Sequence, residues 1–237
     1  MPKVRVDGIW PEPVVLRRGW SRAESRPWNA VTPMAHLRMV RGGGPSFICD
    51  CVDALVEFGA SAVLSPPLPR SAQATWMEAD FERHADLTLM RRQLDHIRPP
   101  GHIVAVGDED DLDEALLIDA AAFDDFWRFD RRAMIEAMQS TAVSVVHVAR
   151  TGEGLAGFAI TGVGRTLAYL QRVAVDPRWQ GQGIGRSLVR TSARWAKKQG
   201  AQALMLNTQA SNEPAISLYA NEGFLSLDEP LAVLKSA

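Results

Sequence analysis

The chain has 237 residues, 46% of them hydrophobic, and its 26 Lys and Arg residues nearly balance 28 Asp and Glu residues. This is enough chain for one large or two small globular domains with a hydrophobic core. The longest apolar runs are far shorter than the roughly 20 residues of a membrane-spanning helix, and no signal-like segment opens the chain. With basic residues dispersed among acidic ones, we expect a cytoplasmic protein without a membrane or nucleic-acid partner.

The cysteines and histidines show no metal-binding pattern. Cys49 and Cys51 lie two residues apart in a stretch of helical character, where side chains at that spacing point in different directions. The five histidines lack the spacing of a ligand set. We therefore expect reduced thiols and no metal.

A Pro-Pro-Gly segment marks the predicted domain boundary. A Leu- and Arg-rich run of helical appearance stops at Arg98, and residues 99–101 separate it from a β-like run. The sequence thus predicts two domains, residues 1–98 and residues 99–237.

The second domain is predicted to be α/β, in the broad sense that includes α+β. Hydrophobic periodicity and turn residues define its elements. In chain order they are a strand at residues 103–106, helices at 111–123 and 131–139, strands at 144–149, 155–161 and 167–175, a helix at 185–199, a strand at 201–208, a helix at 213–222, and a closing strand pair at 224–234.

The first 98 residues contain a weak copy of part of the second half. Gly44 precedes Gly59 by 15 residues, as Gly185 precedes Gly200, and both later glycines open similar runs of small and aliphatic residues. Internal similarity of this kind indicates duplication of one supersecondary unit.

The similarity extends to a pair of aromatic residues. Trp76 precedes Phe81 by five residues, as Tyr219 precedes Phe224. The first copy departs from the second elsewhere, since Asp80 replaces a glycine and too few residues precede the copy for two leading helices. We expect a partial module that does no chemistry.

A glycine-rich loop lies between the strand ending at Val175 and the helix beginning near Gly185. Unpaired N–H groups at a helix start bind anions, and glycine allows the backbone to approach closely. Such a loop alone does not establish a ligand site, because a tight connection between a strand and a helix has the same pattern. A Rossmann dinucleotide site would place a carboxylate at the end of the next strand. Residues 206–209 there are Leu-Asn-Thr-Gln, so the sequence fits a Rossmann site poorly.

Two motifs resemble the signatures of the GNAT superfamily of N-acetyltransferases. Q/R-x-x-G-x-G/A is matched at Gln180, Gly183 and Gly185, and N-x-x-A-x-x-L-Y-x-x-x-G-F is matched at every fixed position from Asn212 to Phe224. The resemblance covers roughly residues 103–237 and is strongest to the ribosomal-protein alanine acetyltransferase branch. It implies a GNAT fold, a mixed twisted central sheet flanked by helices, here in tandem with the partial N-terminal copy.

The resemblance implies acetyl-coenzyme A as co-substrate. Its pantetheine arm would add to a splayed strand through main-chain groups, and its pyrophosphate would lie in the glycine-rich loop. Plain β-core packing is the alternative for the strand residues, and both roles can hold at once. The implied contacts are Val173, Ala174, Val175, Gln180, Gly181, Gln182, Gly183, Ile184, Gly185, Arg186 and Ser187.

By the same resemblance, Tyr219 is the general acid that protonates the departing thiolate. A half-buried aromatic residue on an amphipathic helix is the alternative. Asn212 is expected either to contact the cofactor or a water, or only to cap the helix.

No carboxylate occupies the places where relatives carry a catalytic glutamate, which here hold Asn207 on one strand and Gln171 and Arg172 on another. An ordered water would then remove the proton of the amine, or the amine would arrive neutral and need no base. The pKa of an α-amine is about 7.7 to 8.0 and that of lysine about 10.4, which favours an α-amine or another weakly basic amine.

An aromatic loop, with Phe126 and Trp127, lies where relatives shape the acceptor cleft, and core packing is its alternative. We count Phe126, Trp127 and Asn207 as candidate acceptor contacts. The function expected is direct acetyl transfer to a primary amine of a protein N-terminus or a small molecule. A non-catalytic acyl-coenzyme A sensor or scaffold is the alternative.

Overall fold

The computed structural model describes residues 4–237 and divides the chain into two compact units. Unit 1 comprises Met1–Thr88 and Asp228–Ala237, and unit 2 comprises Leu89–Leu227. The predicted boundary between residues 98 and 99 therefore lies within unit 2. The last residues join unit 1 because the C-terminal strand pairs there.

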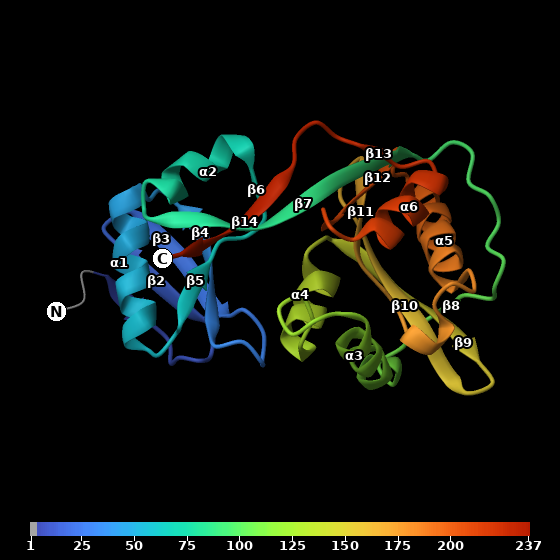
Figure 1. Cartoon of the computed structure of the whole chain (residues 1–237), viewed down its shortest axis with the longest axis horizontal. Helices are drawn as coiled ribbons and strands as arrows, with labels where there is room; N and C mark the ends of the chain where they lie inside the picture. The colour runs from blue at the N-terminus through green and yellow to red at the C-terminus, as the bar shows by residue number, and fades with distance from the viewer. Residues whose placement is uncertain (1–3) are drawn as a thin grey trace. The chain divides into compact units, whose positions relative to one another are not determined.

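Unit 1 is a sheet with the strand order β1-β2-β3-β4-β5-β14-β7, in which only β4 and β5 pair in parallel (Figure 1). Its elements are β1 Arg5–Asp7, β2 Val14–Arg18, β3 Ser21–Pro27, β4 Met34–Arg41, α1 Pro45–Glu57, β5 Ala62–Leu64, β6 Leu68–Pro69, α2 Arg70–Met77, the first part of β7 Phe81–Gln93, and β14 Leu231–Ser236.

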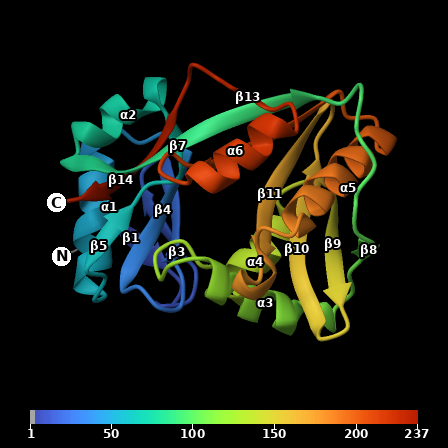
Figure 2. The ribbon, with the colours of Figure 1, turned by 45° about the vertical axis from the view of Figure 1, so that its right-hand side comes forward.

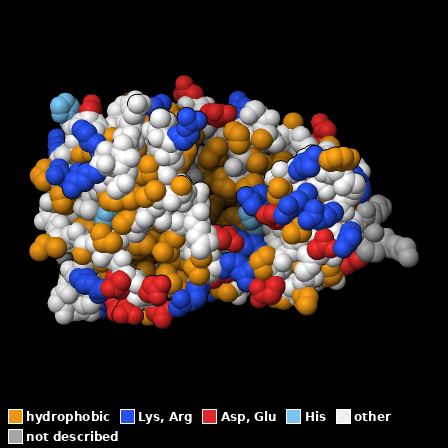
Figure 3. Space-filling model, turned by 180° about the vertical axis from the view of Figure 1, so that it is seen from behind, with side chains coloured by type: hydrophobic (Ala, Val, Ile, Leu, Met, Phe, Trp, Pro, Cys, Tyr) orange, Lys and Arg blue, Asp and Glu red, His pale blue; other side chains and the backbone are white. Residues whose placement is uncertain are grey.

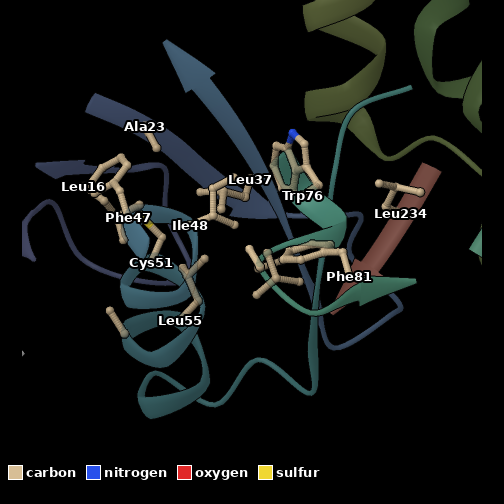
Figure 4. Close-up of a cluster of buried hydrophobic side chains, with 14 of the residues drawn as sticks. Leu16, Ala23, Leu37, Phe47, Ile48, Cys51, Leu55, Trp76, Phe81 and Leu234 are labelled. Atoms are coloured by element: carbon tan, nitrogen blue, oxygen red, sulfur yellow. The ribbon is translucent and has the colours of Figure 1, made fainter. Parts of the chain in front are cut away.

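The core of unit 1 forms where α1 packs on one face of this sheet. Alternate residues of β2 and β4, among them Leu16 and Leu37, point inward and are fully buried, as the two-residue period of a strand requires. Phe47 of α1 and Leu234 of β14 complete the cluster (Figure 4). A strand from the far end of the chain is thus part of this core.

Unit 2 has the strand order β8-β9-β10-β11-β12-β7, with β13 paired to β7. Its elements are the last part of β7, β8 Ala105–Val106, α3 Asp111–Ala122, α4 Arg131–Gln139, β9 Val143–Thr151, β10 Gly154–Val163, β11 Leu167–Val175, the 3-10 turn Pro177–Trp179, α5 Ile184–Lys198, β12 Ala203–Gln209, α6 Glu213–Asn221 and β13 Leu225–Ser226.

Two layers of helix enclose the sheet of unit 2 (Figure 2). On one face, Leu188 of α5 packs in a cluster with Tyr219 and Phe224. On the other, Phe158 and Ile160 of β10 pack with α3 and α4. This arrangement explains why β10 is buried along nearly its whole length.

Two predictions about the chain are wrong. The Leu- and Arg-rich run that ends near Arg98 is largely the strand β7 rather than a helix, because pairing with β14 and β13 overrides its helix-favouring composition. The closing strand pair at residues 224–234 is divided, since β13 pairs with β7 in unit 2 and β14 belongs to the sheet of unit 1.

Unit 1 repeats the β-α-β-α order of the second half of unit 2. The helices α1 and α5 are each followed by a glycine in the left-handed region, Gly59 at φ +94° and Gly200 at φ +89°. Asp80 at φ +65° and Gly223 at φ +82° occupy matching turns. The backbone conformation is therefore retained even where aspartate replaces glycine.

The matched aromatic pairs also make matching contacts. The rings of Trp76 and Phe81 are 4.9 Å apart between centroids, and those of Tyr219 and Phe224 are 5.7 Å apart, both edge to face. In each unit this contact joins the last helix, α2 or α6, to the chain that follows it.

Candidate active site

The glycine-rich loop turns from the end of β11 into α5 through two left-handed glycines, Gly181 at φ +76° and Gly183 at φ +85°. Its entry is fixed by the amide of Gln180, which donates to the Val175 carbonyl at 3.0 Å. Gly183 is the N-cap of α5, so the helix starts at the loop.

The start of α5 offers a row of main-chain donors. Within the described chain, the first main-chain bond from this region runs from the Ser187 N–H to the Gly183 carbonyl at 3.1 Å, and no carbonyl accepts the N–H groups of residues 181–186. Such groups, aided by the positive end of the helix dipole, form an anion site.

The parallel strands β11 and β12 diverge beside this loop. They pair only from Leu167 with Ala203 to Tyr169 with Met205, although β11 continues to Val175 and β12 to Gln209. A bulge in the β10–β11 pairing at Gln171 follows directly after the paired stretch, and bulges bend the strand that carries them. On that side the main chain of residues 173–175 is therefore available to an extended ligand, apart from the Val175 carbonyl, which accepts from Gln180.

The side chains of these strand residues pack in the core. Ala174 is buried against the α3 and α4 layer, while Val173 and Val175 pack on the opposite, α5 side. The predicted core role and the predicted main-chain role are thus compatible.

Tyr219 projects from α6 into the cluster that also holds Ile184, the first residue of α5. Asn212 caps α6 by accepting from the Ala215 N–H at 3.2 Å. Burial raises the pKa of Tyr219 to about 12, and the nearby positive charge of Arg172 lowers it to a smaller degree. The phenol is protonated at neutral pH and can donate a proton.

Arg172 is held in a buried ion pair that sequence reasoning did not find. Its guanidinium donates to both carboxylate oxygens of Asp119 on α3, at 2.6 and 2.7 Å, and lies between the rings of Phe123 and Phe129, 3.5 and 3.9 Å from their centroids. Phe123 and Phe129, which flank Phe126 and Trp127 in the chain, thus both contact this buried charge.

The three candidate acceptor contacts lie on two elements, the aromatic loop and β12. Phe126 and Trp127 pack edge to face at 4.8 Å in the aromatic loop, whose Trp127 carbonyl accepts from Arg172 at 2.9 Å. Asn207 is exposed near the end of β12. The amide nitrogen of Gln171 is buried without a hydrogen-bond partner among the described residues, against Thr141 and Gly162.

Two predicted loop contacts have protein partners. Ser187 is buried, and its hydroxyl accepts from the N–H groups of Gly101 and His102 at 3.2 and 3.1 Å and donates to the Gly183 carbonyl. Arg186 lies 3.4 Å from the buried Glu222 of the α6 C-cap. Of these partners, Glu222 occupies a variable position of the second motif and Gly101 and His102 lie outside both motifs.

Within residues 4–237, no three His, Cys, Asp or Glu side chains are grouped to hold a metal ion. Burial raises the pKa of Cys51 to about 12, so this thiol is inert. No helix in the same range is both long and apolar enough to cross a membrane. On the face shown in Figure 3, Lys and Arg side chains lie among Asp and Glu side chains.

With the loop, the splayed strands and the tyrosine in place, comparison with known proteins identifies the domain. Residues 109–224 match the Acetyltransferase (GNAT) family. The chain contains a GNAT acetyltransferase domain.

Curated relatives agree with this family. The chain is 44% identical over 70 residues to the [ribosomal protein bS18]-alanine N-acetyltransferase of Escherichia coli, a match covering 30% of this chain and 47% of that enzyme. It is 28% identical over 177 residues to a mycothiol acetyltransferase of Nocardioides, covering 63% of this chain and 60% of the relative. The chain therefore spans about half the length of the relatives it matches.

Solved structures extend the likeness in fold to both units. A tandem GNAT protein from the clavulanic acid biosynthesis pathway superposes with a TM-score of 0.66 at 12% identity, covering 99% of this chain and 83% of that one. At this identity the likeness establishes the tandem GNAT fold alone.

The Asp119–Arg172 pair yields a stability prediction. Asp119→Asn leaves a guanidinium that is largely buried without its counter-charge, so we expect unit 2 to lose about 3 kcal/mol. Native-state hydrogen exchange of β10 and β11 amides measures this opening. Asp113→Asn, the same change at an exposed ion pair on α3, should cost at most about 1 kcal/mol. Equal effects of the two substitutions would contradict this account.

Proposed function

We propose that this protein is an acetyl-coenzyme A-dependent N-acetyltransferase that transfers the acetyl group directly to a primary amine. The observation that carries the proposal is the row of unbonded N–H groups at the start of α5, beside the open end of the β11–β12 pair. The N–H groups would bind the pyrophosphate of the co-substrate, and the open strand edge would bind its pantetheine arm.

The chemistry requires little more than positioning. The amine nitrogen attacks the thioester carbonyl, the C–N bond forms, and the C–S bond breaks as the intermediate collapses. Tyr219, protonated at neutral pH, donates its proton to the thiolate, and the proton lost by the amine passes to water. The phenol then regains a proton from solvent.

The acceptor we propose is an α-amine or another weakly basic amine. Neither strand position where relatives carry a catalytic carboxylate has one here. Asn207 occupies the position on β12, and Gln171 and Arg172 occupy the position on β11. The charge of Arg172 is paired with Asp119. An acceptor that is already neutral needs no strong base. The relatives act on an alanine of a ribosomal protein and on mycothiol, so a protein N-terminus and a small molecule are the two acceptor classes.

Within this proposal, the catalytic domain corresponds to the predicted residues 99–237, and residues 1–98 form a partner module without catalysis. Trp76 occupies the place of Tyr219 and has no acidic hydroxyl. A cytoplasmic location fits an acetyl-coenzyme A-dependent reaction.

A non-catalytic acyl-coenzyme A sensor is the second candidate, favoured by the missing carboxylate. The test is release of free thiol from acetyl-coenzyme A with a panel of peptide and small-molecule amines. Amine-dependent turnover supports the enzyme, whereas cofactor binding without turnover across the panel supports the sensor.

Cofactor binding should depend on the loop glycines. Acetyl-coenzyme A at about 100 times its Kd should raise the Tm by roughly 5 to 10 °C. Gly183→Leu should abolish the shift, because a side chain at the left-handed N-cap obstructs the anion site. Gly200→Leu, equally strained at φ +89° but at the far end of α5, should keep the shift. A normal shift in Gly183→Leu would exclude the loop as the binding site.

Tyr219→Phe tests the general acid. We expect kcat to fall about 10²-fold, the low end for a general acid, because a thiolate with a pKa near 8.5 is already a fair leaving group. The KM for acetyl-coenzyme A should change little, since the hydroxyl acts on charge that develops in the transition state. Tyr169→Phe, at an exposed tyrosine in the paired part of β11, is the control. Full activity of Tyr219→Phe across the pH range would assign the residue to packing.

A further inference from the structure

An extended segment, residues 94–102, lies along α5 and ends at the glycine-rich loop (Figures 1 and 2). We name this segment the strap. Leu94 and Ile97 anchor it by packing against the α5 side of the sheet. Three basic side chains of α5 donate to alternate strap carbonyls: Lys197 to Asp95 at 2.7 Å, Arg194 to Ile97 at 3.5 Å and Arg190 to Pro99 at 3.0 Å.

The spacing of these bonds shows that the strap runs antiparallel to α5. Residues 190 and 197 are about 10 Å apart along a helix, and residues 95 and 99 are about 13 Å apart in an extended chain. One helix face can therefore hold the strap throughout, in a fixed register. That register brings Gly101 and His102 to the Ser187 hydroxyl, at the start of α5.

His102 makes the last contact of the strap. Its Nε2 lies 2.8 Å from the carbonyl oxygen of Gln182, so the ring nitrogen carries the hydrogen and donates it. The carbonyl belongs to the peptide between Gln182 and Gly183. In a trans peptide the C=O and N–H groups point in opposite directions, so fixing this carbonyl also fixes the Gly183 N–H.

The fixed peptide lies where the loop would otherwise be most free. Gly181 and Gly183 flank Gln182, and glycine loses more conformational freedom on ordering than any other residue. A loop ordered before the ligand arrives avoids that cost during binding.

We propose that His102 is a positioning residue for the coenzyme A pyrophosphate, holding the Gln182–Gly183 peptide so that its N–H faces the anion. This inference rests on the proposed function and adds to it a residue outside both signature motifs. The strap sets the position of His102, and the Ser187 hydroxyl holds its main chain.

The experiment compares His102→Leu with His102→Gln, whose amide can still donate to the Gln182 carbonyl. Isothermal titration with coenzyme A gives Kd, and steady-state kinetics give KM and kcat. Loss of one preorganising hydrogen bond should raise Kd and KM about three- to tenfold in His102→Leu and leave kcat within about twofold. His102→Gln should bind within about twofold of wild type.

His96→Leu is the matched control, because His96 is an exposed strap residue whose main-chain carbonyl accepts from Arg92. Its coenzyme A affinity should be unchanged. If His102→Leu binds coenzyme A as tightly as the wild type, the inference about His102 is wrong and the proposed function is unaffected. Equal weakening in His102→Leu and His102→Gln would also overturn the inference, because the ring itself would then be the ligand. Failure of the wild type to bind coenzyme A would overturn the proposed function and this inference together.

Discussion

The divergence of β11 from β12 is the constraint on which the candidate site depends. Two neighbouring parallel strands normally satisfy each other's main-chain groups along their shared length, and here pairing stops after Tyr169 and Met205. On its other side β11 stays paired with β10 as far as Val175, through a bulge at Gln171. The unpaired edge of β11 leads into the loop before α5, and under the proposed function an extended, anionic ligand would bind both.

Unit 1 repeats part of this scaffold but differs at the position that corresponds to the loop. Its strands β4 and β5 also pair over a short stretch, and a glycine-rich loop also precedes α1. Pro45 at the start of α1 removes one main-chain donor, and the side chains of Met39 and Phe47 crowd Gly43. These features support the proposal that unit 1 is a structural partner.

Local patterns in the sequence were sufficient for most of unit 2. The helix Arg131–Gln139 and the strand Leu167–Val175 have the predicted bounds, because their capping residues and alternation are local signals. The two signature motifs located the loop and Tyr219. The strand β7 and the placement of β14 could not be predicted, since each depends on partners more than 100 residues away in the chain.

The contacts that support the site also could not be predicted from the sequence. Asp119 and Arg172 are separated by 53 residues, and nothing in either local sequence marks them as partners. His102 follows a Pro-Pro-Gly segment that reads as a linker, yet the basic residues of α5 hold that segment in place. Contacts that form only when distant elements pack leave no periodic or motif signal.

The most direct test of the central claim is a crystal structure of the protein with coenzyme A. The account predicts pyrophosphate oxygens within hydrogen-bond distance of N–H groups in residues 181–186, and pantetheine amides bonded to the main chain of residues 173–175. Coenzyme A bound at the start of α1, or at α5 with β11 and β12 closed on each other, would contradict it.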